Sequence, residues 1–140
     1  MVHLPELRWE RRRADASKTP GTYRWAMRYQ VTEADTAVAV GSGDVPVLAT
    51  PRLIAWMEAA TVRCAAPFIG AGQTTVGTAI RVEHRRPTVV GDSVEILATA
   101  PDAADGRRLT FTVQAIDTSG TVVAAGEIDR AIVERNRFLA

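Results

Sequence analysis

Apolar and polar residues alternate along five segments of the chain, which is the pattern of half-buried β-strands. These segments cover residues 22–31, 75–85, 93–100, 107–117 and 121–133. In the first segment Trp25, Met27 and Tyr29 share one face, so we expect that face to pack against a core. Turn-forming sequences, among them DAADG and TSG, separate the later segments. We therefore expect the last four strands to form an antiparallel meander.

Residues 50–67 have the spacing of an amphipathic α-helix. Thr50 and Pro51 predict its start, because threonine is a good N-cap and proline suits the first helical turn. Pro67 predicts its end, because proline disfavours helical geometry in the residue before it. The expected apolar stripe consists of Leu53, Ile54, Met57, Thr61, Cys64, Ala65 and Phe68. Glu58 lies at the border of this stripe.

The order of these elements predicts an α+β fold. A strand is followed by a long connection at 32–51, then by a helix, and then by four more strands. Connections of this length in compact domains are usually functional. Because the helix has a predominantly apolar stripe, we expect it to lie on one face of a curved antiparallel sheet that wraps around it.

Length and composition are those of a single globular domain. The chain has 140 residues, of which 46% are apolar and 24% charged, and this excludes a disordered, collagen-like or coiled-coil chain. No apolar run reaches the roughly 20 residues that a membrane helix needs. The net charge of +1 gives no overall nucleic-acid footprint. We expect one domain over residues 21–140 and neither nucleic acid nor a membrane as partner.

Basic residues are concentrated near the N-terminus, with acidic residues between them. Residues 1–20 show no clean periodicity, so we interpret them as a basic tail or an extra edge segment. An arm that binds anions is the alternative, because clustered arginines attract phosphate groups.

No motif for a metal or a redox cofactor is present. Cys64 is the one cysteine, which excludes an internal disulfide and a zinc site built from cysteines. It falls on the apolar stripe and is interpreted as a small core residue. The sequence also lacks a G-x-S-x-G elbow, a Walker loop and a G-x-G-x-x-G turn. We expect no cofactor, and a cytoplasmic location is the simplest expectation.

Three polar residues occupy positions where burial is expected. Thr50 begins the helix, Glu58 borders its stripe, and His84 shares a strand face with Ile80 and Val82. Each has an ordinary explanation, as a helix cap, a solvated charge and a partly buried histidine. Together they supply the hydroxyl, carboxylate and imidazole that acyl transfer uses. The imidazole can accept and return a proton near neutral pH.

The spacing of these residues limits how they can act together. Thr50 and Glu58 are separated by about 12 Å along the helix axis, since each residue adds about 1.5 Å. One chain cannot easily bring both to the same reacting atom. Either a dimer pairs the Thr50 of one copy with the Glu58 of another, or one of the two acts indirectly. Gly77 would let a ligand approach the backbone closely, because it has no side chain.

Three blocks of sequence occur in the order found in a known family. They are ATPRLIAWMEAA, the GTAI strand with His84 seven residues after Gly77, and the spacing H-x-x-P-x-x-x-G-D-x-V. Over residues 23–133 the chain resembles the fluoroacetyl-CoA thioesterase-like branch of the hotdog-fold thioesterases. The resemblance implies a hotdog fold, with a curved sheet around one long central helix. It also implies an enzyme, a homodimer that hydrolyses an acyl-CoA thioester to free acid and CoA near the subunit interface.

The resemblance further implies roles for individual residues. Thr50, Glu58 and His84 match the catalytic threonine, glutamate and histidine of the family. Gly77 matches a glycine in the wall of the site, and Arg130 matches an arginine near the acyl end of the pocket. His84 would handle the proton, while Thr50, Glu58 and water all remain open as the nucleophile. Coenzyme A enters as part of the substrate, and no further cofactor is implied.

The segment before the helix departs from the family pattern. The fluoroacetyl-specific enzyme has an aromatic-bearing lid there, whereas residues 37–49, AVAVGSGDVPVLA, are small and aliphatic. We therefore expect a short-to-medium acyl chain, not necessarily fluoroacetyl-CoA. Arg85 and Arg86 are candidates for contacting the CoA phosphates. The alternatives are a non-catalytic acyl-CoA-binding dimer and a hotdog hydratase or dehydratase.

Overall fold

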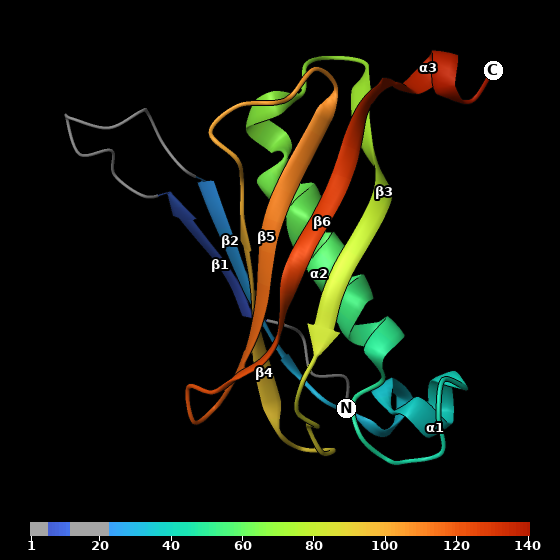
Figure 1. The fold of residues 1–140 in the computed structure, drawn as a ribbon, viewed down its shortest axis with the longest axis vertical. Helices are drawn as coiled ribbons and strands as arrows, with labels where there is room; N and C mark the ends of the chain where they lie inside the picture. The colour runs from blue at the N-terminus through green and yellow to red at the C-terminus, as the bar shows by residue number, and fades with distance from the viewer. Residues whose placement is uncertain (1–5, 12–22) are drawn as a thin grey trace.

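The structure, a computed structural model, describes residues 6–11 and 23–140. Six strands of this part form one antiparallel sheet in the order β1-β2-β4-β5-β6-β3 (Figure 1). The strands are β1 (Glu6–Arg11), β2 (Tyr23–Gln30), β3 (Gln73–His84), β4 (Ser93–Thr99), β5 (Arg108–Asp117) and β6 (Val122–Glu134). The helices of the described part are α1 (Ala37–Val40), α2 (Thr50–Cys64) and α3 (Arg135–Phe138), with 3₁₀ turns at Glu33–Asp35 and Ala66–Phe68.

Helix α2 lies against one face of the curved sheet, as its apolar stripe predicts. Figure 1 shows it behind the strands, extending along their length. Leu53 and Met57 are fully buried on the helix side, and Leu109, Phe111 and Val113 of β5 are fully buried on the sheet side. Alternate residues of β5 thus point into one core, as the period of two requires. The predicted α+β fold, with a helix wrapped by an antiparallel sheet, is confirmed.

The pairing of β3 differs from the predicted meander. Strands β4, β5 and β6 are consecutive neighbours, but β3 pairs with β6 at one edge of the sheet, with His84 opposite Ala124. The sequence predicts a turn between neighbouring strands at residues 86–92, but in the structure residues 85–92 connect strands that are not neighbours. This connection is long enough to pass from that edge to β4, and a hydrogen bond from the Leu48 N–H to the Thr88 carbonyl (2.8 Å) holds it.

Thr50 is not the N-cap of α2, so this prediction is wrong. Ala49 is the N-cap, because its backbone is extended and its carbonyl accepts the hydrogen bond of the Leu53 N–H at 3.0 Å. Thr50 and Pro51 are the first two helical residues, where a missing N–H removes no intrahelical hydrogen bond. The Thr50 hydroxyl is therefore not engaged in capping and is available for another contact.

The long connection between β2 and α2 contains a 3₁₀ turn and α1 before it reaches the helix. We call residues 37–49 the lid segment. An isolated β-bridge joins Val47 of this segment to Val89, in the connection that follows β3. The lid segment is thereby attached, through its backbone, to the stretch of chain directly after His84.

Strand β1 pairs with β2 and forms the other edge of the sheet. Residues 1–5 and 12–22, which hold much of the basic N-terminal segment, lie outside the described residues, as does any anion-binding arm there. Among the described helices none is long and apolar enough to cross a membrane. The described residues also contain no group of three His, Cys, Asp or Glu side chains that could hold a metal ion.

Candidate active site

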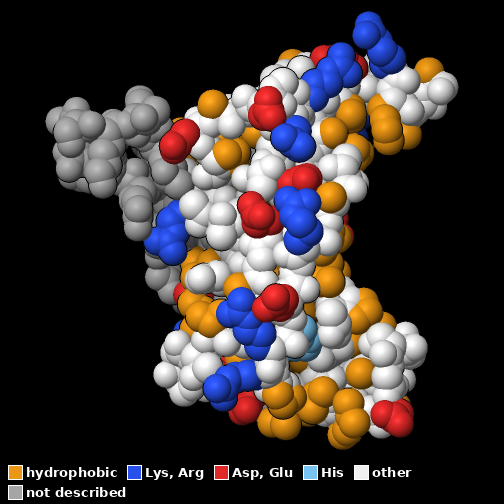
Figure 2. Space-filling view, viewed as in Figure 1, with side chains coloured by type: hydrophobic (Ala, Val, Ile, Leu, Met, Phe, Trp, Pro, Cys, Tyr) orange, Lys and Arg blue, Asp and Glu red, His pale blue; other side chains and the backbone are white. Residues whose placement is uncertain are grey.

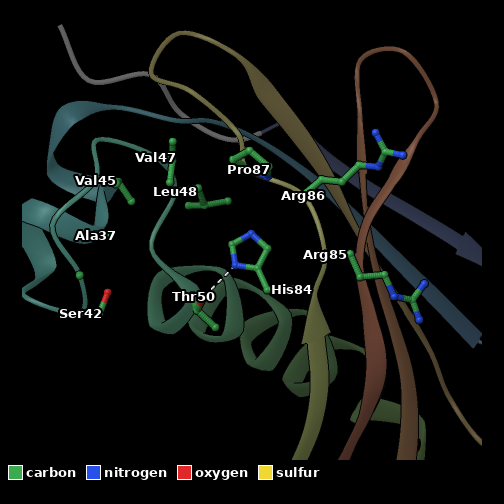
Figure 3. Close-up of a pocket in the computed structure, with 11 residues that line it drawn as sticks. Ala37, Ser42, Val45, Val47, Leu48, Thr50, His84, Arg85, Arg86 and Pro87 are labelled. Carbon is green, nitrogen blue, oxygen red and sulfur yellow. Dashed lines mark hydrogen bonds between the residues drawn. The ribbon is translucent and has the colours of Figure 1, made fainter.

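Thr50 and His84 meet where the start of α2 lies beside the end of β3. The Thr50 Oγ1 lies 2.7 Å from the His84 Nδ1, within hydrogen-bond distance (Figure 3). With the ring proton on Nε2, Nδ1 accepts the proton of the hydroxyl, which is the arrangement of a nucleophile and its base. The structure thus brings together two of the residues that the sequence analysis selected.

The surroundings of His84 favour the neutral imidazole. Burial lowers the pKa of His84 below its usual value of 6.5, because desolvation disfavours the charged ring, and an interaction with the Arg86 backbone raises it in part. The Nε2 atom is buried and has no hydrogen-bond partner of good geometry among the described residues. A neutral ring at neutral pH can accept a proton, so His84 has the ionisation state that a general base needs.

An open cavity of about 310 Å³ contains this pair in its wall. Its apolar lining consists of Pro87 and of four residues of the lid segment, namely Ala37, Val45, Val47 and Leu48. In Figure 3 the side chains of Arg85 and Arg86 extend away from His84 and from the lid segment. Figure 2 shows further hydrophobic side chains gathered at the end of the molecule that carries α1. The cavity is therefore apolar on the lid side, and the two arginines line its other side while their charged ends point away from it.

Glu58 belongs to a second group of residues, away from His84. The Arg130 Nη1 lies 3.4 Å from the Glu58 Oε2, and the guanidinium is 6% exposed. Its Nε donates to the Thr75 Oγ1 at 2.9 Å, and its Nη2 donates to the Thr75 carbonyl at 3.1 Å. Burial lowers the pKa of Arg130, and Glu58 offsets this in part. We call Glu58, Thr75, Gly77 and Arg130 the arginine cluster.

Gly77 lies opposite Arg130 in the β3–β6 pairing, at the start of a bulge. A Cβ added at Gly77 would lie 2.7 Å from the Glu58 Oε2, closer than real Cβ contacts occur. Within this chain the missing side chain therefore makes room for the Glu58 carboxylate. This space is the one that we expect from the sequence to admit a ligand.

The five residues selected from the sequence thus form two groups in one chain. Thr50 and His84 make one, and Glu58, Gly77 and Arg130 make the other. Thr75 was not selected, because a threonine in a strand has no distinctive sequence signal. Its place two residues before Gly77, on the same strand face, is the one feature that would have drawn attention to it.

A family model described as "Fluoroacetyl-CoA-specific thioesterase" matches residues 31–136. The chain belongs to this family. The fluoroacetyl-CoA thioesterase of Streptantibioticus cattleyicolor is 35% identical over 94 residues, which are 67% of this chain and 66% of that protein. The chain therefore matches slightly less than two thirds of the length of that relative.

Solved structures of thioesterases have the same fold. A structure of a fluoroacetyl-CoA thioesterase has a TM-score of 0.74 and 30% identity, over 83% of this chain and 89% of that chain. A thioesterase superfamily member from Thermus thermophilus has a TM-score of 0.78 at 24% identity, over 87% and 89% of the two chains. The hotdog fold and the thioesterase family that the sequence resemblance implies are both confirmed.

Proposed function

We propose that the protein is an acyl-CoA thioesterase that hydrolyses an acyl-CoA thioester to free acid and CoA. The observation that carries this proposal is the 2.7 Å contact between the Thr50 hydroxyl and the His84 imidazole in the wall of an open cavity. Membership of a thioesterase family supports it. A solved complex of a similar protein, a variant of the fluoroacetyl-CoA-specific thioesterase with fluoroacetate and CoA, also supports it. That protein is 30% identical and has a TM-score of 0.73, over 82% of this chain and 95% of that chain.

The chemistry follows from the neutral state of His84. His84 accepts a proton from the attacking hydroxyl, either that of Thr50 or that of a water molecule, as the oxygen bonds to the thioester carbon. The carbon–sulfur bond then breaks, and His84 returns the proton to the CoA sulfur. If Thr50 attacks first, water hydrolyses the resulting ester in a second round. The N-terminus of α2, with its partial positive charge, stabilises the developing oxyanion.

A homodimer accounts for the two groups of residues. In one chain Glu58 lies about 12 Å along α2 from Thr50. Two α2 helices packed in opposite directions would place the partner subunit's Glu58 near the Thr50–His84 pair. Strand β3 supports this arrangement, since it lies at an edge of the sheet and Ile80 on it is 42% exposed. The site would then combine residues of both chains.

The lid segment supports a preference for short to medium acyl chains rather than for fluoroacetyl-CoA alone. Its side chains at the cavity are small or aliphatic, and Val45 is half exposed. The aliphatic side chains of such a wall favour an aliphatic acyl chain by the hydrophobic effect. Arg85 and Arg86 border the cavity and are proposed to meet the CoA phosphates, because guanidinium groups bind phosphate bidentately.

We further propose that the protein binds no nucleic acid and lies in the cytoplasm. Figure 2 shows basic and acidic side chains interspersed over the outer face of the sheet, which does not favour nucleic acid. The buried thiol of Cys64 fits a reducing, cytoplasmic compartment. No cofactor is proposed beyond the coenzyme A of the substrate.

The test measures free thiol released from acetyl-, butyryl-, hexanoyl- and octanoyl-CoA. We expect turnover by the wild type and a loss of about hundredfold or more in kcat/KM for His84→Ala, since general base catalysis is typically worth 10²–10⁴-fold. His3→Ala, which changes the other histidine, is the matched control and should retain full activity. Binding without thiol release would favour the non-catalytic dimer, and release undiminished in His84→Ala would refute the mechanism.

A further inference from the structure

Arg130 is a buried cation, and each of its three guanidinium nitrogens has a partner within the chain. Its Nε and Nη2 donate to Thr75, and its Nη1 contacts Glu58. Burying a guanidinium is costly unless its donors are satisfied, and the residue Arg130 is only 6% exposed. Three of its five N–H groups, one on each nitrogen, have partners within the chain. This arrangement points to a role within the protein rather than toward the substrate.

Thr75 makes two of these contacts and determines which way the guanidinium faces. The side chain lies on β3, two residues before Gly77 and on the same face, and is 9% exposed. Its hydroxyl and its carbonyl hold two nitrogens on one side of Arg130. The third nitrogen, Nη1, is thereby turned toward α2, where it meets the Glu58 carboxylate. Gly77 supplies the space in which that carboxylate sits.

We propose that Thr75 is a positioning residue, which fixes Arg130 so that Arg130 holds the Glu58 carboxylate in its reactive place. The proposal rests on the proposed thioesterase function for its effect on turnover. It also changes the role of Arg130, from an arginine that contacts the acyl group to one that orients Glu58. In this role Thr75 touches neither the substrate nor the reacting atoms.

The first test compares Thr75→Val with Thr75→Ser. Valine has the shape of threonine but no hydroxyl, so the Arg130 Nε loses its acceptor, whereas serine keeps it. We expect kcat to fall about tenfold in Thr75→Val with KM changed less than twofold, since a hydrogen bond to a charged group is worth at least that factor. Thr75→Ser keeps the hydroxyl and should have the kcat of the wild type. Equal kcat in wild type and Thr75→Val would overturn the proposal.

Thr110→Val is the matched control for structural damage. Thr110 lies on β5 and donates to the Asp129 Oδ1 at 2.8 Å, in a network with Arg81 on the outer face of the sheet. This variant also deletes a threonine hydroxyl bonded to a charged partner. We expect it to leave kcat unchanged. A drop in kcat equal to that of Thr75→Val would mean that both variants act through general destabilisation, and would overturn the proposal.

A double-mutant cycle tests whether Thr75 acts through Arg130. If it does, Thr75→Val adds nothing once Arg130→Met has removed the guanidinium, and the double variant has the kcat of Arg130→Met alone. Independent roles would instead multiply the two losses, and this result would overturn the proposal. The Glu58 side chain is 37% exposed, so Arg130→Met leaves its carboxylate partly hydrated.

A spectroscopic measurement separates this proposal from the proposed function. The Arg130 Nε–H gives its own ¹H–¹⁵N signal, assigned by its absence in Arg130→Met. We expect slow exchange with water in wild type and Thr75→Ser, and exchange at least tenfold faster in Thr75→Val. If wild type releases no CoA but this difference holds, the thioesterase function fails and the positioning contact stands. If the exchange rates are equal, the positioning contact fails whatever the activity.

Discussion

The Glu58 carboxylate occupies the space beside Gly77 that a side chain there would fill, because an added Cβ would lie 2.7 Å from its Oε2. Gly77→Ala should therefore displace the carboxylate. We expect kcat/KM to fall about tenfold or more, since small misplacements of a functional group can cost up to a hundredfold. Gly70→Ala is the control, because its Cβ would meet Gln73 at an ordinary 3.7 Å. Unchanged activity in Gly77→Ala would mean that Glu58 has no role in turnover.

The Thr50–His84 contact predicts a graded loss at position 50. Thr50→Val removes the hydroxyl that lies 2.7 Å from Nδ1 and should reduce kcat/KM about hundredfold. Thr50→Ser keeps a hydroxyl and should retain a substantial part of the activity. Thiol release at saturating and limiting acyl-CoA gives both kinetic constants. Equal rates for the valine and serine variants would exclude a role for the hydroxyl.

The lowered pKa of His84 predicts the pH range in which kcat/KM falls on the acidic side. Burial disfavours the imidazolium, so the ring takes up its proton, and activity is lost, at a lower pH than for an exposed histidine. We expect the acidic limb of kcat/KM to have its midpoint below pH 6.5. An acidic limb centred above pH 6.5 would contradict this assignment.

The same shift has a consequence for stability. Because the folded protein binds the proton more weakly than the unfolded chain, the free energy of unfolding should decrease as pH falls below about 6.5. His84→Gln should flatten this part of the pH dependence. Urea unfolding of both proteins between pH 7 and 5 measures the difference.

Cys64 should be inert in the folded protein. Its side chain is fully buried, and burial raises the pKa of its thiol to about 11, so almost no thiolate is present at pH 8. We expect no reaction with a chromogenic disulfide over the minutes of an assay, and full reaction in guanidinium chloride. Rapid labelling of the native protein would show that α2 separates from the sheet.

The aliphatic lid segment predicts how chain-length preference can be changed. Val45 lines the cavity, so Val45→Phe should fill part of its volume of about 310 Å³ and lower the rate with octanoyl-CoA relative to acetyl-CoA. Val62→Phe is the control, because Val62 is similarly exposed on α2 but does not line the cavity. Equal octanoyl-to-acetyl ratios in wild type and Val45→Phe would place the acyl chain elsewhere.

Local periodicity was sufficient for strands β2 to β6 and for the main helix, but not for β1, whose residues show no clean alternation. The inward residues of β5 are fully buried at every second position, because a strand directs its side chains to alternate faces. Periodicity carries no information about which strands are neighbours. Strand β3 pairs with β6, which follows it by about 40 residues in the sequence, and a pairing between strands so far apart cannot be deduced from alternation.

The candidate site was predictable in its members but not in its grouping. The resemblance selected Thr50, Glu58 and His84, and in the structure Thr50 contacts His84. Glu58 instead contacts Arg130, which is distant in sequence and is brought near by the β3–β6 pairing. Apart from its place two residues before Gly77, Thr75 has no sequence signal, since its importance comes from its contact with Arg130.

The bridge between Val47 and Val89 fixes the backbone of the lid segment while leaving its side chains free to vary. Substitutions at positions such as 45 can reshape the wall of the cavity without shifting the end of β3, where His84 lies. A change in the acyl chain that the cavity accepts therefore does not require a change in the contact between Thr50 and His84.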